Sequence, residues 1–302
     1  MDFGRIDSYS SVNYAFPPER NLDLGFLAGG KLSAGLRVRI GLTAFSEKDW
    51  VGNFYPSTTK TNQMLQAYAS NCGTIEFNPT YYGIPTDLQI QKWRAQVDPS
   101  FKFCPKFPST LSKDPLNTLG SFEWEEWIHC LEAFGQNAGP CFMQLPLNYG
   151  PENENKLLQF FQSWDNSKSL TLELRHPGWF ESSRLEKLAQ FLFDIGIGLV
   201  ITDVAGRKDV CHMLCTASYC IVRFVGNQHS SDLTRLIAWA EKLHLWESNG
   251  LKDIYFFVHQ PSPESSFKSA HWFGQYLNKN LKMNVSFPKY AMPNEQQMSL
   301  FI

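Results

Sequence analysis

Leu170 to Phe180 read L-T-L-E-L-R-H-P-G-W-F and are the most informative residues of the chain. The stretch begins as an apolar, buried type of strand, and it carries Glu173 and Arg175 two positions apart, so both side chains leave the same face. Burying such charges costs free energy unless they are paired or used. A strand of this kind therefore indicates that its end contributes to a functional site.

Similar short apolar runs recur along the chain, separated by segments with the periodicity of helices. The eight expected strands are Arg37–Thr43, Thr74–Asn78, Phe101–Lys106, Cys141–Leu145, Leu170–Arg175, Gly198–Asp203, Tyr219–Val225 and Asp253–His259. Eight strand–helix repeats predict a TIM-type (β/α)8 barrel, with an N-terminal arm at 1–36, the barrel at 37–286 and an extended C-terminal tail at 287–302. After strand six, Val204 to Ser218 leave room only for a short helix.

A doubly wound nucleotide-binding sheet is the alternative fold. The residues after the first strand, Gly41 to Phe45, contain neither a glycine-rich dinucleotide fingerprint nor a phosphate loop. The barrel is therefore the favoured interpretation.

Composition limits the class of protein. The chain of 302 residues is 43% hydrophobic and 15% aromatic with a formal net charge of -2, which predicts a large core and no general attraction to nucleic acid or anionic membrane. No apolar run reaches the length of a membrane helix, the N-terminus lacks a secretory signal, and the seven cysteines have no framework spacing. We expect a cytoplasmic protein that does not bind membranes, with its cysteines acting as small buried residues.

Polar side chains end seven of the eight expected strands. These side chains are Glu76 and Asn78, Lys106, Gln144, Glu173 and Arg175 with His176 behind them, Asp203, Arg223, and His259 with Gln260. In a barrel the C-terminal strand ends form the catalytic mouth, so we expect these groups to converge there.

Different chemistries fit this set. In the favoured one, Lys106, Arg175 and Arg223 bind a phosphate or carboxylate, while Glu173 or Asp203 acts as general base and Glu76 orients a cation or a substrate hydroxyl. Alternatively, Glu76, Glu173, Asp203 and His259 ligate a divalent metal, although the cations among them compete for the same carboxylates, and we expect no cofactor. The structural alternative is an ion-pair network, pairing Glu173 with Arg175 or Glu76 with Arg223.

Further residues near the mouth are candidates for substrate binding. His176, Asn78, Tyr82 and Trp179 follow strand ends, and aromatic residues there form a stacking surface for a sugar or base. Trp50, Tyr55 and Tyr81 have the same position. Packing of these rings on the barrel rim is the competing interpretation.

Several of these stretches resemble the YecE-like family, the domain of unknown function numbered 72. The similar segments are Asp49–Pro56, Thr74–Tyr82, Phe101–Lys106, Glu173–His176 with Trp179, and Val222–Phe224. The resemblance extends from about Gly41 to Asn280 and implies a TIM-type barrel, but no established reaction. The eighth strand ends in His259, where the family usually shows an asparagine-rich end, which puts any role for His259 in doubt.

The tail contains a second resemblance. Gln297-Met298-Ser299-Leu300-Phe301 resembles the pentapeptide by which bacterial proteins dock on the DNA-polymerase sliding clamp. A glutamine for hydrogen bonding and two apolar side chains for a pocket suit such docking. A chance match in an apolar terminus is the alternative.

The sequence therefore supports two hypotheses of different classes. The first is an enzyme, a hydrolase or a lyase or isomerase, with its site at the barrel mouth and a small anionic substrate or nucleic acid as its ligand. The second is an accessory protein of DNA metabolism that docks on the sliding clamp through Gln297, Met298, Leu300 and Phe301. A degenerate barrel that serves as a scaffold is the third alternative, and the charges at the strand ends argue against it.

Overall fold

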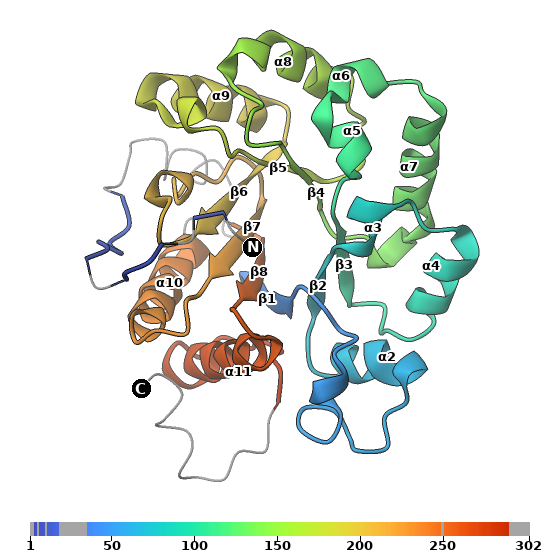
Figure 1. The fold of residues 1–302 in the computed structure, drawn as a ribbon, viewed down its shortest axis with the longest axis vertical. Coiled ribbons are helices and arrows are strands. Elements are labelled where there is room, and N and C mark those ends of the chain that lie inside the picture. Colours follow the sequence, from blue (N-terminus) through green and yellow to red (C-terminus); the bar gives the residue numbers. More distant parts are fainter. Residues whose placement is uncertain (1–2, 5, 10, 18–34, 249–250, 290–302) are drawn as a thin grey trace.

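The computed structural model describes residues 3–4, 6–9, 11–17, 35–248 and 251–289. Eight parallel strands form one sheet in the order β3-β2-β1-β8-β7-β6-β5-β4, and helices form a ring around them (Figure 1). The strands are β1 (Arg37–Leu42), β2 (Thr74–Phe77), β3 (Lys102–Pro105), β4 (Cys141–Gln144), β5 (Leu170–Glu173), β6 (Gly198–Asp203), β7 (Tyr219–Val225) and β8 (Asp253–His259). The predicted TIM-type (β/α)8 barrel is confirmed.

The helices follow the strands as the apolar periodicity predicts. They are α2 (Met64–Ala69), α3 (Pro79–Tyr82), α4 (Asp87–Arg94), α5 (Ser109–Lys113), α6 (Pro115–Thr118), α7 (Phe122–Ala133), α8 (Glu154–Gln162), α9 (Ser182–Asp194), α10 (Ser231–Ser248) and α11 (Pro263–Asn280). The sixth unit has only the short 3-10 helix η6 (Lys208–Val210), as the spacing predicts. None of the described helices combines the length and the apolar character that crossing a bilayer requires.

The barrel is incompletely sealed between β3 and β4. Other neighbouring strands form continuous ladders, whereas these two share only the isolated bridges Phe103↔Ala138 and Lys106↔Phe142. A cavity of about 480 Å³ lies at the N-terminal end of this seam, lined by Gly139, Cys141 and neighbouring residues.

The apolar core has two parts, because each strand buries both of its faces. The larger part fills the space between the strands and the helices. The smaller part fills the barrel, with Cys104, Phe142, Val200, Ile221, Tyr255 and Phe257. Gly41 belongs to this inner surface, since a Cβ there would lie 2.5 Å from the carbonyl oxygen of Thr74. The inner cluster is an apolar plug below the C-terminal mouth.

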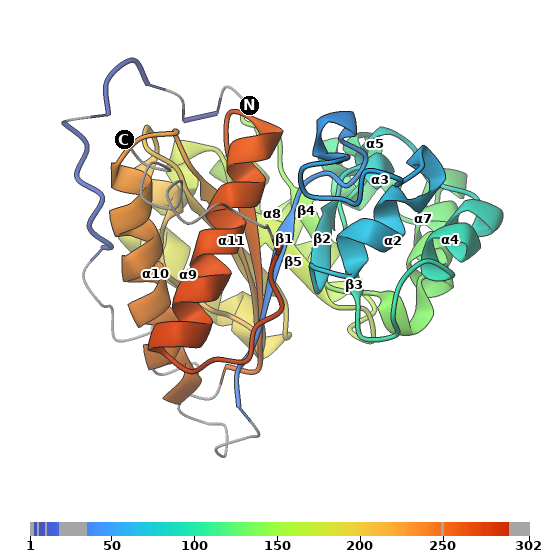
Figure 2. The same cartoon turned by 90° about the horizontal axis from the view of Figure 1, so that it is seen from below.

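The described part of the N-terminal arm lies against the C-terminal half of the barrel, beside α10 (Figures 1 and 2). Phe16 packs edge-on against Trp239 of α10, and the amide of Gly206 donates to the carbonyl of Gly4. The ring of Phe3 lies 4.5 Å from the guanidinium carbon of Arg175. The arm therefore reaches the rim of the mouth.

Candidate functional site at the barrel mouth

The mouth is built around a fully buried arginine on β7. The Nε and Nη2 of Arg223 donate to the two carboxylate oxygens of Glu76 at 2.9 and 3.1 Å, and Nη1 donates to Oε1 of Glu173 at 2.7 Å. The side chain of Arg223 is 0% exposed and both carboxylates are 1% exposed. The predicted structural pairing of Arg223 with Glu76 is present, together with a second ion pair to Glu173, and a role of Arg223 in anion binding stays a prediction.

The remaining oxygens of Glu173 are also satisfied. Thr202 donates to Oε1 at 2.9 Å, Gln144 donates to Oε2 at 2.5 Å, and Arg175 lies 3.6 Å from Oε1. Burial alone would raise the pKa of Glu173, but Arg223 and Arg175 outweigh it and lower the pKa to about 2. Glu173 is therefore a carboxylate at neutral pH.

Glu76 forms a dyad with the last residue of β8. Nε2 of His259 lies 2.9 Å from Oε2 of Glu76, and the amide of Asn78 donates to Oε1 at 3.3 Å. Burial lowers the pKa of His259 and outweighs the opposing effect of Glu76, so the imidazole is neutral at neutral pH. The pKa of Glu76 is held well below its usual range, because Arg223 and His259 outweigh the effect of burial. The dyad is an oriented, neutral imidazole next to a carboxylate, which is an arrangement suited to proton transfer.

Two further cations face the mouth. Nζ of Lys106 donates to the amide oxygen of Gln144 at 3.1 Å and lies 4.2 Å from the centre of the Tyr81 ring. The side chain of Arg175 is 15% exposed, and its Nε is buried without a hydrogen-bond partner. Arg175 pairs with Glu173 at 3.6 Å, whereas Lys106 forms no ion pair with a described residue. The three cations Arg223, Arg175 and Lys106 face two carboxylates, Glu76 and Glu173, so one positive charge is left over.

A small cavity adjoins this cluster. It has a volume of about 230 Å³ and lies at the C-terminal ends of β1 and β2, where its lining includes Thr43, Phe45, Glu76, Asn78 and Tyr82. Tyr82, one of the lining residues, is 84% exposed. The cavity therefore adjoins Glu76 and is also lined by the aromatic residue Tyr82.

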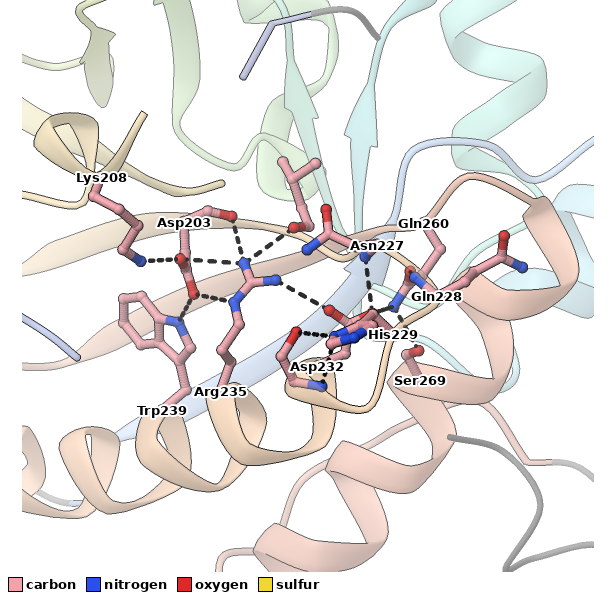
Figure 3. A network of polar contacts seen from close by, with 12 residues as sticks. Asp203, Lys208, Asn227, Gln228, His229, Asp232, Arg235, Trp239, Gln260 and Ser269 are labelled. Atoms are coloured by element: carbon pink, nitrogen blue, oxygen red, sulfur yellow. Dashed lines mark hydrogen bonds and ion pairs between the residues drawn. The ribbon is translucent and has the colours of Figure 1, made fainter. Parts of the chain in front are cut away.

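Asp203 does not belong to this cluster, so the prediction that it shares the mouth is wrong. Its carboxylate points to the helical side of the sheet, where it accepts from Lys208 at 2.8 Å, Arg235 at 3.1 Å and Trp239 at 3.0 Å (Figure 3). Thr202 takes the inward position of β6 instead. Arg235 and Lys208 outweigh burial and lower the pKa of Asp203 to about 2. Asp203 therefore fixes α10 and η6 to the sheet.

Because Asp203 lies on the other side of the sheet, the four residues considered as metal ligands are not brought together. The described part of the chain holds no group of three or more His, Cys, Asp or Glu residues placed to bind a metal ion.

Two other predicted site residues have structural contacts. Trp179 is fully buried and donates from its indole nitrogen to the carbonyl of Tyr149 at 2.8 Å. Nδ1 of His176 accepts from the amide of Gly178 at 3.1 Å and caps the 3-10 helix η5 (Pro177–Phe180). Trp50 and Tyr55 are also buried. Of the aromatic candidates, Tyr81 and Tyr82 are those that the structure brings to the mouth.

Gln144 and His259 were expected at the mouth but were given no role in anion binding or acid–base chemistry, and Thr202 was not predicted there. Gln144 and His259 are visible in the sequence as polar strand ends, and the strand-end position was the signal for both. Thr202 gave no such signal, because a threonine inside an apolar strand is common. The clamp-like residues Gln297, Met298, Leu300 and Phe301 lie outside the described residues.

The fold and the mouth define a TIM-type barrel with a buried network of ionisable groups at the C-terminal ends of its strands. The family described as "Protein of unknown function DUF72" matches residues 39–296, and the chain belongs to this family. Its expected YecE-like character is thereby confirmed.

Comparison with known proteins gives relatives of the same family. The chain is 28% identical to the UPF0759 protein YecE of Escherichia coli (strain K12) over 284 residues, which cover 87% of this chain and 100% of YecE. It is 22% identical to the UPF0759 protein YunF of Bacillus subtilis (strain 168) over 165 residues, covering 51% of this chain and 56% of YunF.

Solved structures share the fold. A DUF72 family protein from Thermotoga maritima MSB8 aligns with a TM-score of 0.61 at 21% identity, covering 82% of this chain and 100% of that one. A DUF72 family protein from Enterococcus faecalis V583 aligns with a TM-score of 0.61 at 19% identity, covering 85% of this chain and 100% of that one.

Proposed function

We propose that this protein is a cytoplasmic enzyme that acts on a small anionic substrate at the C-terminal mouth of its barrel. The observation that carries the proposal is the excess of positive charge there. Arg223 donates its hydrogen bonds to Glu76 and Glu173, while Lys106 and Arg175 have N–H groups that can donate to a ligand. A phosphate or carboxylate between these two cations would satisfy the buried Nε of Arg175.

The acid–base chemistry falls to His259. Glu76 fixes the orientation of its imidazole, and the neutral ring accepts a proton at neutral pH. Glu173 keeps the cations in place and stabilises positive charge that develops near it. These roles suit a lyase or isomerase that moves a proton, or a hydrolase that activates water. The cavity beside Tyr82 would hold the uncharged part of the substrate.

Anion binding is tested with sulfate, whose charge does not change near neutral pH. We expect sulfate to raise the melting temperature of the wild type and to bind measurably in calorimetry. Arg175→Met should weaken binding by roughly ten- to a hundredfold, which corresponds to the loss of one charged hydrogen bond.

The matched control is Arg39→Met. Arg39 pairs with Asp253 at the opposite end of the barrel, at 2.5 Å, and its loss should leave sulfate affinity unchanged. Equal effects of the two substitutions, or no sulfate binding by the wild type, would contradict the proposed anion site.

A second candidate function rests on the tail. The pentapeptide Gln297–Phe301 supports docking on the DNA-polymerase sliding clamp, which would place the protein in DNA metabolism with nucleic acid as its anionic ligand. The test is a pull-down with the purified clamp. The wild type should bind and the double substitution Leu300→Ala/Phe301→Ala should not, while both proteins show the same melting temperature. A double variant that binds as well as the wild type refutes docking through this segment.

A further inference from the structure

Lys106 is the buried cation that the fold leaves without a carboxylate. Three cationic side chains of the described residues are at least nine-tenths buried: Lys106 at 8% exposure, Arg223 at 0% and Arg235 at 2%. Both arginines bond to two acidic residues each. Lys106 forms no ion pair with a described residue, and the one hydrogen bond from its side chain to a described residue runs to the neutral amide of Gln144. Its surroundings therefore favour the uncharged amine over the ammonium.

The groups that face Lys106 have a net effect in the same direction. Burial is the largest effect, followed by the positive charge of Arg223, and with Arg175 these outweigh the attraction of Glu76 and Glu173, lowering the pKa of Lys106 to about 8. At pH 7 about a tenth of the molecules then carry a neutral amine at this position, against about one in 3000 for an ordinary lysine. A neutral amine in a desolvated pocket is a nucleophile towards carbonyl groups.

We propose that Lys106 forms an imine with the carbonyl carbon of the substrate, which makes the substrate class a small oxo acid or a phosphorylated aldehyde or ketone. The inference rests on the proposed function, since it assigns the anionic group to Arg175 and the carbonyl to Lys106. In the step, the lone pair of the amine forms the C–N bond, and the carbonyl oxygen leaves as water with the two hydrogens of the amine. No oxidant or reductant takes part.

The geometry supports this assignment of roles. Lys106 and Arg175 are both connected to Glu173. Gln144 accepts from Nζ of Lys106 at 3.1 Å and donates to the carboxylate of Glu173 at 2.5 Å, and Arg175 lies 3.6 Å from the same carboxylate. A two- or three-carbon oxo acid has its carboxylate next to its carbonyl, so one short molecule reaches both side chains. The Glu76–His259 dyad belongs to the same network through Arg223, and its imidazole is in the protonation state that removes a proton from the carbon next to an iminium.

The test traps the imine in the wild-type protein. Glyoxylate, an aldehyde that carries a carboxylate, is added with sodium cyanoborohydride, and the reduced adducts are located by peptide mapping. We expect Lys106 to be labelled at least about tenfold faster than any other lysine at pH 7, because its free-amine fraction is larger. The rate at Lys106 should level off above about pH 8, following its pKa.

Two controls separate this inference from the anion site. Acetaldehyde, which has no charge, should label Lys106 selectively but about tenfold more slowly than glyoxylate. Lys102 is the first residue of β3, the strand that Lys106 directly follows, and it lies at the opposite end of the barrel. It is the matched residue, and Lys102→Met should leave the labelling of Lys106 unchanged. Lys106→Met should remove the fast phase, and its urea unfolding curve shows whether the variant is folded.

The outcomes differ for the two proposals. Labelling spread evenly over the surface lysines overturns the imine even if sulfate binds at Arg175. Selective labelling of Lys106 that is equally fast with glyoxylate and acetaldehyde supports the reactive amine and overturns the anion site.

Discussion

Replacement of Arg223 by methionine tests the electrostatic account of the mouth most directly. Arg223 makes three hydrogen bonds of 2.7 to 3.1 Å to two carboxylates, and all three side chains are at most 1% exposed. Arg223→Met leaves Glu76 and Glu173 buried without their main countercharge. Removing one partner of such a network costs about 3–5 kcal/mol, and we expect the free energy of unfolding to fall by that amount at pH 7.

The pH dependence should also change sign. In the wild type, both carboxylates have pKa values below those of the unfolded chain, so they stabilise the fold above about pH 5 and this stability is lost as the pH falls towards 2. Without Arg223, burial raises these pKa values above their unfolded values. The variant then loses stability as the pH rises, so it should be more stable at pH 5 than at pH 7.

The assay is urea unfolding of both proteins between pH 5 and 8. Lys106→Met is the matched control, because it removes a buried cation of the same cluster that has no ion pair. It should change the free energy of unfolding by less than about 1 kcal/mol. A loss of under about 1 kcal/mol in Arg223→Met, or a pH profile parallel to that of the wild type, would refute the reasoning.

Three further substitutions follow from the fold and the mouth. Asp203→Asn weakens the ion pairs with Lys208 and Arg235, so it should lower the free energy of unfolding in urea by about 2–4 kcal/mol. It should leave sulfate affinity unchanged. Weaker sulfate binding by a folded variant would show that Asp203 contributes to the mouth. Gly41→Ala should lower the free energy of unfolding by about 1–3 kcal/mol, because the added Cβ would lie too close to the carbonyl oxygen of Thr74. The control Gly73→Ala should lower it by less, since the nearest atom to its added Cβ is 3.6 Å away. Similar losses for both variants in thermal unfolding would show that the barrel relaxes around position 41. The pKa of His259 is lowered, so His259 gains a proton below pH 6.5, and sulfate binding by the wild type should tighten there in calorimetry. His259→Asn should not show this tightening, and an identical rise in affinity in the variant would assign the proton to another group.

The fold could be predicted because each strand carries its own evidence. β6, β7 and β8 have the predicted bounds, since their apolar runs are closed on both sides by turn-forming residues. β5 ends at Glu173, two residues before its predicted end, because Pro177 and the cap made by His176 start a 3-10 turn there. The strand ends that differ in β1 to β4 shift by one residue.

The membership of the mouth was harder to predict from the sequence. In a parallel barrel both faces of a strand are apolar, so the alternation that separates inside from outside is hidden. In β6 the sequence does not show which of Thr202 and Asp203 faces the inside of the barrel, and Asp203 was predicted to do so because it is charged. The prediction that Trp179 binds substrate met a related difficulty, since a loop aromatic residue that packs into the core has the same sequence pattern as one that faces a ligand. Arg223 was placed correctly, but its pairing with two carboxylates depends on contacts across 50 and 147 residues of sequence.

The seam between β3 and β4 has a consequence for motion. Backbone amides that lack a continuous ladder open more readily than those of β7 and β8, so hydrogen exchange should be faster along this line than elsewhere in the sheet. Lys106 and Phe142 form the bridge at its upper end, and the large cavity lies at its lower end. A movement that widens the gap between β3 and β4 would shift the amine of Lys106 relative to Arg175, which follows β5, so the spacing of the two cations would vary with the width of the gap.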